Sequence, residues 1–169
     1  TGVVLFARTS KALTRMNMQF KERDVEKIYV ALIRRKPQPM AGRLEHYLKK
    51  DTQKNRTKLY SEFREGSKKA ILDYEYISKA NHCFLLLVKP LTGRPHQIRV
   101  QLARTFTGIV GDVKYGQTKP NRDQSIYLHA LGLRFNHPVT KDKLTLHAPL
   151  PNFDNWKFFK DIEQNLLKE

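Results

Sequence analysis

The hydrophobic and polar positions along the chain predict strands that alternate with helices. Residues 3–7 form a short apolar run, which predicts a buried strand. Residues 11–21 carry apolar side chains at helical spacing and predict a helix, for which Thr9 and Ser10 offer N-cap hydroxyls. A run rich in β-branched residues over 27–33 follows, and two prolines end it. The first third of the chain therefore reads as strand, helix, strand.

The middle of the chain is polar and basic before it becomes apolar again. Residues 41–68 hold only weak strand signals broken by glycine and asparagine, so we expect a mobile hairpin there. Residues 72–77 and 84–88 predict two strands. Pro95 stands where a helix can begin, in its first turn. One face of that helix carries Ile98, Gln101, Leu102 and Thr105.

The last third of the chain predicts a glycine-rich loop over 108–116 and strands over 126–135 and 144–148. A C-terminal amphipathic helix is indicated by the spacing of Trp156, Phe159, Ile162 and Leu166. No repeat or linker divides the chain, and strands outnumber helices. We therefore predict one α+β domain over residues 1–169, with a mixed, mostly antiparallel sheet flanked by helices. Because residues 1–7 read as the middle of a fold, we expect the domain to be truncated at its N-terminus.

The charge balance favours a polyanionic partner. The 169 residues include 32 Lys and Arg against 16 Asp and Glu, a formal net charge of +16. Such an excess is typical of proteins that bind phosphate backbones. A membrane surface is the competing partner, but it would require a basic amphipathic helix, and here the cations are spread along the whole chain. No run of about 18 apolar residues occurs either, so we expect nucleic acid and no membrane.

Cysteine usage limits two kinds of site. The single cysteine, Cys83, excludes an internal disulfide and any zinc site built on paired cysteines. It stands in an apolar run and is expected to be a buried structural thiol. The absence of disulfides fits a reducing cytoplasm, where we expect the protein to act.

The densest group of chemically active side chains is Thr92-Gly93-Arg94-Pro95-His96-Gln97-Ile98-Arg99. Here a strand leads into a glycine turn, and the turn opens a helix. Helix N-termini attract anions, and guanidinium groups bind carboxylates or phosphates through paired hydrogen bonds. His96 and Arg99 are three residues apart and share a helix face. From these residues alone, a phosphate-binding helix start without a catalytic role remains an equal alternative.

This segment, extended to Val100, resembles the T-G-R-x-H-Q-I/L-R-V signature of the RluA family of RNA pseudouridine synthases. Four other segments agree with family motifs in the same order along the chain. They are Thr1 to Thr9, Lys27-Ile28-Tyr29-Val30-Ala31, Gly111-Asp112-Val113-Lys114-Tyr115-Gly116, and Leu128-His129-Ala130 with the following Phe135-Asn136-His137-Pro138. The resemblance covers the chain from Thr1 to about Pro149.

The resemblance implies a reaction on specific uridines of structured ribosomal or transfer RNA. The base is flipped out, its N-glycosidic bond is cleaved, and C5 is attached to the sugar. The family uses an aspartate that the alignment places about four residues before Thr1, outside this sequence. Arg99 matches the arginine that pairs with this aspartate and keeps it ionised. Tyr29 matches the tyrosine that stacks on the flipped base and is the candidate for removing the C5 proton, so we expect both residues to be catalytic.

The other candidate residues are expected to bind the RNA substrate: Lys27, Arg94, His96, Gln97, Leu128 and His129. For His96, a role in holding the loop is an open alternative, and Asp112 and His129 are also candidates for structural supports. Gln101 stands where family members often have histidine, a variation that we expect to leave activity intact. Lys and Arg residues of 49–69 are expected to hold the RNA backbone.

The isomerisation is redox-neutral, so we expect no cofactor and no metal. A monomer is the state typical of the family. The alternative function is a non-catalytic RNA-binding protein that keeps the synthase fold. The residue four positions before Thr1 discriminates between the two, because only the enzyme requires an aspartate there.

Overall fold

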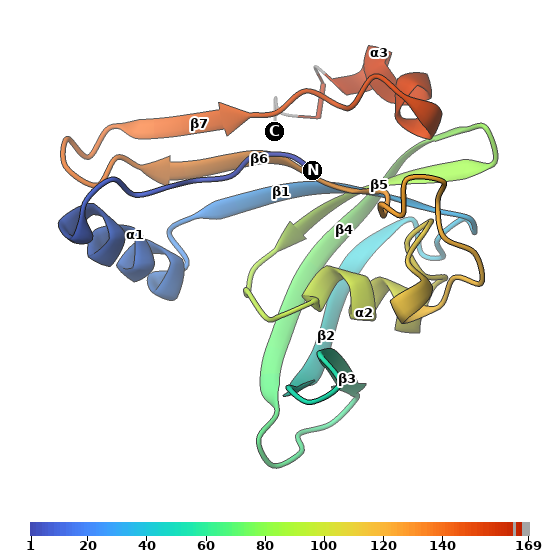
Figure 1. Cartoon of the computed structure of the whole chain (residues 1–169), viewed down its shortest axis with the longest axis horizontal. Coiled ribbons are helices and arrows are strands. Elements are labelled where there is room, and N and C mark those ends of the chain that lie inside the picture. Colours follow the sequence, from blue (N-terminus) through green and yellow to red (C-terminus); the bar gives the residue numbers. More distant parts are fainter. Residues whose placement is uncertain (164, 167–169) are drawn as a thin grey trace.

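The computed structural model describes residues 1–163, 165 and 166 (Figure 1). Among these residues, no helix is long and apolar enough to cross a membrane. In chain order, the elements are α1 (Ser10–Glu22), β1 (Glu26–Ile33), β2 (Ala41–Asp51), β3 (Arg56–Tyr60), β4 (Lys68–Ala80), β5 (Cys83–Pro90), α2 (Gln97–Thr105), the 3-10 helix η1 (Val113–Tyr115), β6 (Leu128–Asn136), β7 (Lys143–His147), the 3-10 helix η2 (Asp154–Phe159) and α3 (Lys160–Glu163).

Within the described residues, seven strands form one sheet in the order β3-β2-β4-β5-β1-β6-β7, and neighbouring strands are antiparallel. β1 lies between β5 and β6, which follow it much later in the chain. Tyr29 in β1 is opposite Val88 of β5 and Ala130 of β6. The register of β1 against β6 shifts between Ile28 and Tyr29, which marks a bulge at this point. Bulges re-aim side chains and are frequent beside functional sites.

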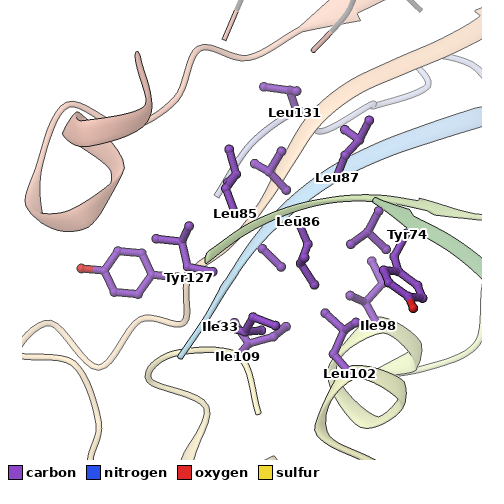
Figure 2. Packing of buried hydrophobic residues seen from close by; sticks show 14 of the residues in the cluster. Ile33, Tyr74, Leu85, Leu86, Leu87, Ile98, Leu102, Ile109, Tyr127 and Leu131 are labelled. Carbon is purple, nitrogen blue, oxygen red and sulfur yellow. The ribbon is translucent and has the colours of Figure 1, made fainter. Parts of the chain in front are cut away.

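The hydrophobic core lies on both faces of the central strands (Figure 2). Successive side chains of a strand point to opposite faces. Leu86 of β5 therefore points toward Ile98 and Leu102 of α2, whereas Leu85 and Leu87 point to the other face (Figure 2). η2 and α3 lie across the sheet from α2 (Figure 1). These observations confirm the predicted α+β class and the antiparallel sheet with flanking helices.

Several predicted elements are confirmed. The helix predicted over 11–21 is α1, and the hydroxyl of Thr9 caps it by accepting a hydrogen bond from the backbone nitrogen of Ala12 at 3.2 Å. The basic segment 41–68 contains the expected hairpin, formed by β2 and β3. β2 also pairs along most of its length with β4. Its strand signal was weak because only Leu44 and Leu48 of this strand are buried.

The strand predicted over residues 3–7 is wrong. Only Gly2 pairs, through an isolated parallel bridge to Ala130, and Val4 and Phe6 are 68% and 84% exposed. The physical reason is competition for an edge. A longer parallel strand would continue along β6 beyond Ala130, but from Gly132 onward that edge of β6 is already paired with β7.

The predicted C-terminal helix is also wrong in kind. Residues 154–159 form the 3-10 helix η2, and the short α3 follows it within the part of the C-terminus that the structure describes. Trp156 and Phe159 are three residues apart, a spacing that places both on one face of either helix type. Residues 164 and 167–169 of the predicted helix lie outside the described residues. The helix expected to begin near Pro95 is present as α2, but it starts at Gln97, with His96 as its N-cap.

Candidate active site

A cleft with a volume of about 190 Å³ opens where β1, the loop after β5 and the start of β6 meet. Every predicted catalytic or substrate-binding residue except His129 lines it. These are Lys27, Tyr29, Arg94, His96, Gln97, Arg99 and Leu128. The sequence motifs that the resemblance joined are therefore also joined in space, although they are widely separated along the chain.

Tyr29 enters the cleft from the bulge in β1 and is half-buried. Burial raises the pKa of its phenol, so the hydroxyl stays protonated at neutral pH. The neutral ring offers a stacking surface, and the phenol can act as a base only after it has given up its own proton. Beside it, the pKa of Lys27 is lowered, mainly by burial and further by the nearby charge of Arg23.

Arg99 is held by a buried carboxylate. Its Nε donates to Oδ2 of Asp112 and its Nη2 donates to Oδ1, both at 2.7 Å. The Asp112 side chain is 0% exposed, and that of Arg99 is 22% exposed. The two hydrogen bonds from Arg99 raise its pKa further, so it is permanently charged. Asp112 thus occupies the Nε and Nη2 edge of the guanidinium group of Arg99, a residue that lines the cleft.

Tyr115 packs against this ion pair. The Arg99 guanidinium carbon lies 5.1 Å from the centre of the Tyr115 ring. The Tyr115 hydroxyl accepts a hydrogen bond from the backbone nitrogen of Thr57 and lies 2.8 Å from Nδ1 of His96. The pKa of His96 is lowered, first by burial and then by the charge of Arg99, so the ring is neutral at pH 7. His96 thus contacts Tyr115 and also lines the cleft, and its role in binding the substrate or in holding the loop stays a prediction.

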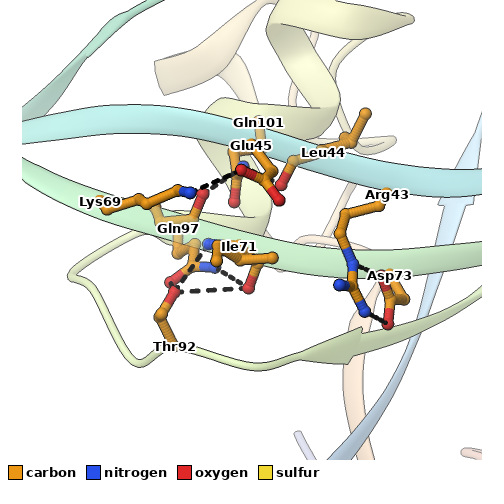
Figure 3. A network of polar contacts seen from close by, with 10 residues as sticks. Arg43, Leu44, Glu45, Lys69, Ile71, Asp73, Thr92, Gln97 and Gln101 are labelled. Atoms are coloured by element: carbon orange, nitrogen blue, oxygen red, sulfur yellow. Dashed lines mark hydrogen bonds and ion pairs between the residues drawn. The ribbon is translucent and has the colours of Figure 1, made fainter. Parts of the chain in front are cut away.

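Gln97 fixes the loop that forms one wall of the cleft (Figure 3). Its Nε2 donates to the carbonyl oxygen of Ile71 at 2.9 Å, and its Oε1 accepts from the Thr92 hydroxyl at 2.7 Å and from the backbone nitrogen of Arg94 at 3.0 Å. Arg94 is held as well, because its Nε donates to the carbonyl oxygen of Lys69. The amide group of Gln97 is thus engaged within the protein, and its contribution to the cleft is to hold Thr92 and Arg94 in place.

His129 lies outside the cleft lining. Its Nδ1 is 2.8 Å from the Thr1 hydroxyl, its Nε2 is 3.1 Å from the carbonyl oxygen of Ala148, and its ring packs beside Trp156. Burial is the main cause that lowers its pKa. These contacts match the alternative role of His129 as a structural support. Gln101 is also absent from the cleft lining, and its Nε2 donates to the carbonyl oxygen of Leu44.

Sequence reasoning assigned no role to Tyr115 or Thr57. The tyrosine stands in the Gly111 to Gly116 motif and was available as a signal. Thr57 lies outside the five motifs, and it donates from its backbone nitrogen to the Tyr115 hydroxyl and from its own hydroxyl to the carbonyl oxygen of Pro95. The expected partner of Arg99 lies upstream of Thr1, so that pairing stays a prediction. In the described part of the chain, the carboxylate on Arg99 is Asp112. No group of three His, Cys, Asp or Glu side chains in that part is placed to hold a metal ion.

The fold and the cleft together define an α+β domain with an aromatic ring and fixed arginines around a small hollow. The model of the RNA pseudouridylate synthase family matches residues 1–104. The chain therefore belongs to this family, and its resemblance to RluA-type synthases is confirmed.

Relatives and solved structures agree with this assignment. The chain is 32% identical over 169 residues to an uncharacterized RNA pseudouridine synthase of Chlorobaculum parvum, with 89% of this chain and 51% of that protein covered. It is 31% identical over 166 residues to tRNA pseudouridine synthase C of Pasteurella multocida, with 88% and 68% covered. The structure of human RNA Pseudouridylate Synthase Domain Containing 1 superposes with a TM-score of 0.72 at 26% identity, over 96% of this chain and 74% of that one. The chain thus spans about half of the first relative and about two thirds of the second.

Proposed function

We propose that this protein is an RNA pseudouridine synthase that isomerises specific uridines of structured transfer or ribosomal RNA. The observation that carries the proposal is the convergence of Tyr29 and Arg99 in one cleft, with Asp112 fixing the arginine. The net charge of +16 supports a polyanionic substrate. Action in the cytoplasm, a monomeric state and independence of cofactors stay predictions from the sequence.

In the proposed reaction, a uridine leaves the RNA stack and its base lies against the ring of Tyr29. This contact replaces the stacking that the base loses. The bond between N1 and the sugar carbon C1′ breaks, the uracil turns, and C5 bonds to C1′. The proton on C5 then leaves and N1 gains one, so atoms and electrons balance without an oxidant. Tyr29, at the wall of the cleft, is the candidate to accept the C5 proton.

Arg99 has the geometry to orient a second carboxylate at its Nη1 end while Asp112 holds its other edge. The family aspartate, about four residues before Thr1, is the proposed occupant. Thr1 is anchored to β6, since its carbonyl oxygen accepts from the backbone nitrogen of Ala130, and Ala130 is paired with Tyr29. Four residues extend at most about 14 Å, so a residue at that position can reach the cleft.

The test measures pseudouridine in RNA from a strain that lacks the gene, after incubation with purified protein expressed with its upstream codons. Tyr29→Phe and Arg99→Ala are each expected to reduce kcat by about 100-fold or more, because each removes a group that contacts the reacting base or its nucleophile. Tyr76→Phe and Arg43→Ala are matched controls. Tyr76 is half-buried in β4, and Arg43 makes a two-bond ion pair with Asp73 on the surface.

Equal activity of the cleft variants and the controls would refute the site assignment. The alternative function, a non-catalytic RNA-binding protein, predicts RNA binding without any pseudouridine. It also predicts a residue other than aspartate at the fourth position upstream of Thr1. Turnover by the native protein excludes this alternative directly.

A further inference from the structure

A second pocket, with a volume of about 480 Å³, lies at the opposite end of β1 from the candidate active site. Four segments that are distant in sequence meet there: the end of β1, the turn between β4 and β5, the loop 117–125, and η2 (Figure 1). Tyr29 and Arg34 are five residues apart, which corresponds to about 17 Å along a strand. A group in this second pocket is therefore too far away to be the base bound at Tyr29.

Three cations line this second pocket, and none of them is paired with a carboxylate of the described residues. Within the described residues, the side chains of Arg34, Arg122 and Lys157 make no hydrogen bond or ion pair. Asp154 is the acidic residue of the lining, so the pocket keeps an excess of positive charge. Cations gathered in a hollow focus their field and attract an anion. These three cations differ from Lys69, an exposed lysine that forms an ion pair with Glu45.

The pocket also carries an exposed aromatic ring. Phe158 is 49% exposed, and the ammonium group of Lys157 lies 5.1 Å from the centre of its ring. Proteins bind single-stranded nucleic acid with exposed aromatic rings beside cations that are not paired with a carboxylate, because bases stack on the rings while phosphates meet the cations. A free phosphate would need only the cations. The ring therefore favours a nucleotide over an inorganic anion.

The rim of this pocket is held in place by contacts within the protein. Nδ2 of Asn81, in the turn after β4, donates to Oδ1 of Asn155 in η2 at 2.7 Å. The backbone nitrogen of Asn155 donates to the hydroxyl of Tyr127, which lines the same pocket. These bonds join segments that are far apart in sequence, so the pocket is formed without a ligand and loses little entropy on binding.

From these observations, we infer that this second pocket binds an unpaired nucleotide of the substrate RNA, outside the uridine that is modified. Its phosphate meets Arg34, Arg122 and Lys157, and its base stacks on Phe158. The inference rests on the proposed function in that RNA is the substrate. It adds a second anchoring point, which would help to select the RNA by the distance between an unpaired nucleotide and the target uridine.

The experiment measures binding of a fluorescein-labelled ten-nucleotide oligouridylate by fluorescence anisotropy between 50 and 300 mM KCl, a range chosen to be about physiological. The triple variant Arg34→Gln, Arg122→Gln, Lys157→Gln is expected to bind about tenfold more weakly at 100 mM. The slope of log affinity against log salt should flatten by about 0.7 for each phosphate group that no longer meets a cation. Phe158→Ala is expected to weaken binding by about tenfold without changing this slope, because it removes stacking and no charge.

The matched control removes the same charge elsewhere. Lys11→Gln, Lys21→Gln, Lys143→Gln changes three exposed lysines at the α1 and β7 end of the molecule. This control triple is expected to stay within about twofold of the native affinity. Equal losses in the two triple variants would overturn the inference, because the effect would then be one of net charge alone. An unchanged affinity in Phe158→Ala would also overturn it.

Two further outcomes are informative. In the first, phosphatidylglycerol vesicles compete for the pocket of the native protein, and both pocket variants bind oligouridylate as tightly as the native protein does. This result would assign the pocket to a membrane surface and refute the inference. The assay involves no turnover. A protein that forms no pseudouridine but shows the expected pocket dependence refutes the proposed function and leaves the nucleotide pocket standing, so the two failures are distinguishable.

Discussion

The substitution Asp112→Asn tests how much the carboxylate that holds Arg99 contributes to stability and to catalysis. The native carboxylate accepts two hydrogen bonds from Arg99 and one from the backbone nitrogen of Tyr115. The substitution keeps the volume of the side chain but replaces one acceptor oxygen with an NH₂ donor. That donor then faces an N–H of Arg99, so one bond disappears and the other no longer has its charge assistance.

The magnitude follows from the burial of this pair. A hydrogen bond between charged groups contributes about 1.5–3 kcal/mol to stability, and an unpartnered buried polar group adds a desolvation penalty. Asp112 is 0% exposed, but Arg99 retains 22% exposure and regains some hydration. The backbone nitrogen of Tyr115 also keeps the carbonyl oxygen of Asp112 as an acceptor. We therefore expect the free energy of unfolding to fall by about 2 kcal/mol, near the lower end of this range.

Urea unfolding followed by circular dichroism measures this loss. With a slope of about 2 kcal/mol per molar urea, the midpoint should fall by about 1 M. Asp73→Asn is the matched control, because Arg43 and Asp73 form the same two-bond pair on the surface, where water screens it. In pseudouridine assays at low urea, Asp112→Asn should lower kcat more than it raises KM, since a loosened Arg99 is misplaced in the bound complex. Equal midpoints for the two variants would refute the reasoning.

Two further predictions concern the space beside a glycine and the pH dependence of stability. Gly108→Ala should lower the urea midpoint, because its new Cβ would lie 2.6 Å from the carbonyl oxygen of Tyr115, whereas Gly93→Ala has no heavy atom within 4 Å and should leave it unchanged. Burial is the main cause that lowers the pKa values of His46 and His129 below 6.5, so folding disfavours their protonated forms. The histidine contribution to stability should therefore be complete above pH 6.5 and decrease as the pH falls through the lowered values. The urea midpoint of the native protein should therefore fall between pH 7 and pH 5, and His129→Gln should make this fall smaller. An equal fall in the variant would contradict the inference that His129 contributes to the pH dependence of stability.

The sequence predicted the residues that line the cleft better than it predicted the contacts that hold those residues in place. The resemblance of five ordered motifs to the RluA family predicted that Tyr29 and Arg99 share one site, and both line the same cleft. Asp112 was predicted only as a support, and its pairing with Arg99 depends on how the loop after α2 folds back. No local pattern specifies that path, so the partner of a charged residue is harder to predict than the residue itself.

The errors in the fold also have physical causes. The apolar run 3–7 has the composition of a strand, but it lacks a free partner because β7 occupies the edge of β6. Near the C-terminus, the spacing of Trp156 and Phe159 does not distinguish a 3-10 helix from an α-helix. The second pocket escaped sequence reasoning for a related reason. Its four segments are distant in sequence, and an isolated cation in each of them resembles ordinary surface charge.

The position of β1 between two late strands has a consequence for how the protein is made. The family match ends at residue 104, before β6 begins, yet β1 pairs with β6 from Glu26 to Ala31. A chain that ends at residue 104 would leave this edge open beside the fully buried Val30 and Ala31. Open apolar edges recruit strands of other chains and promote aggregation. During synthesis, β1 remains an open edge of the sheet until β6 has left the ribosome, so the nascent chain exposes an aggregation-prone strand for that interval.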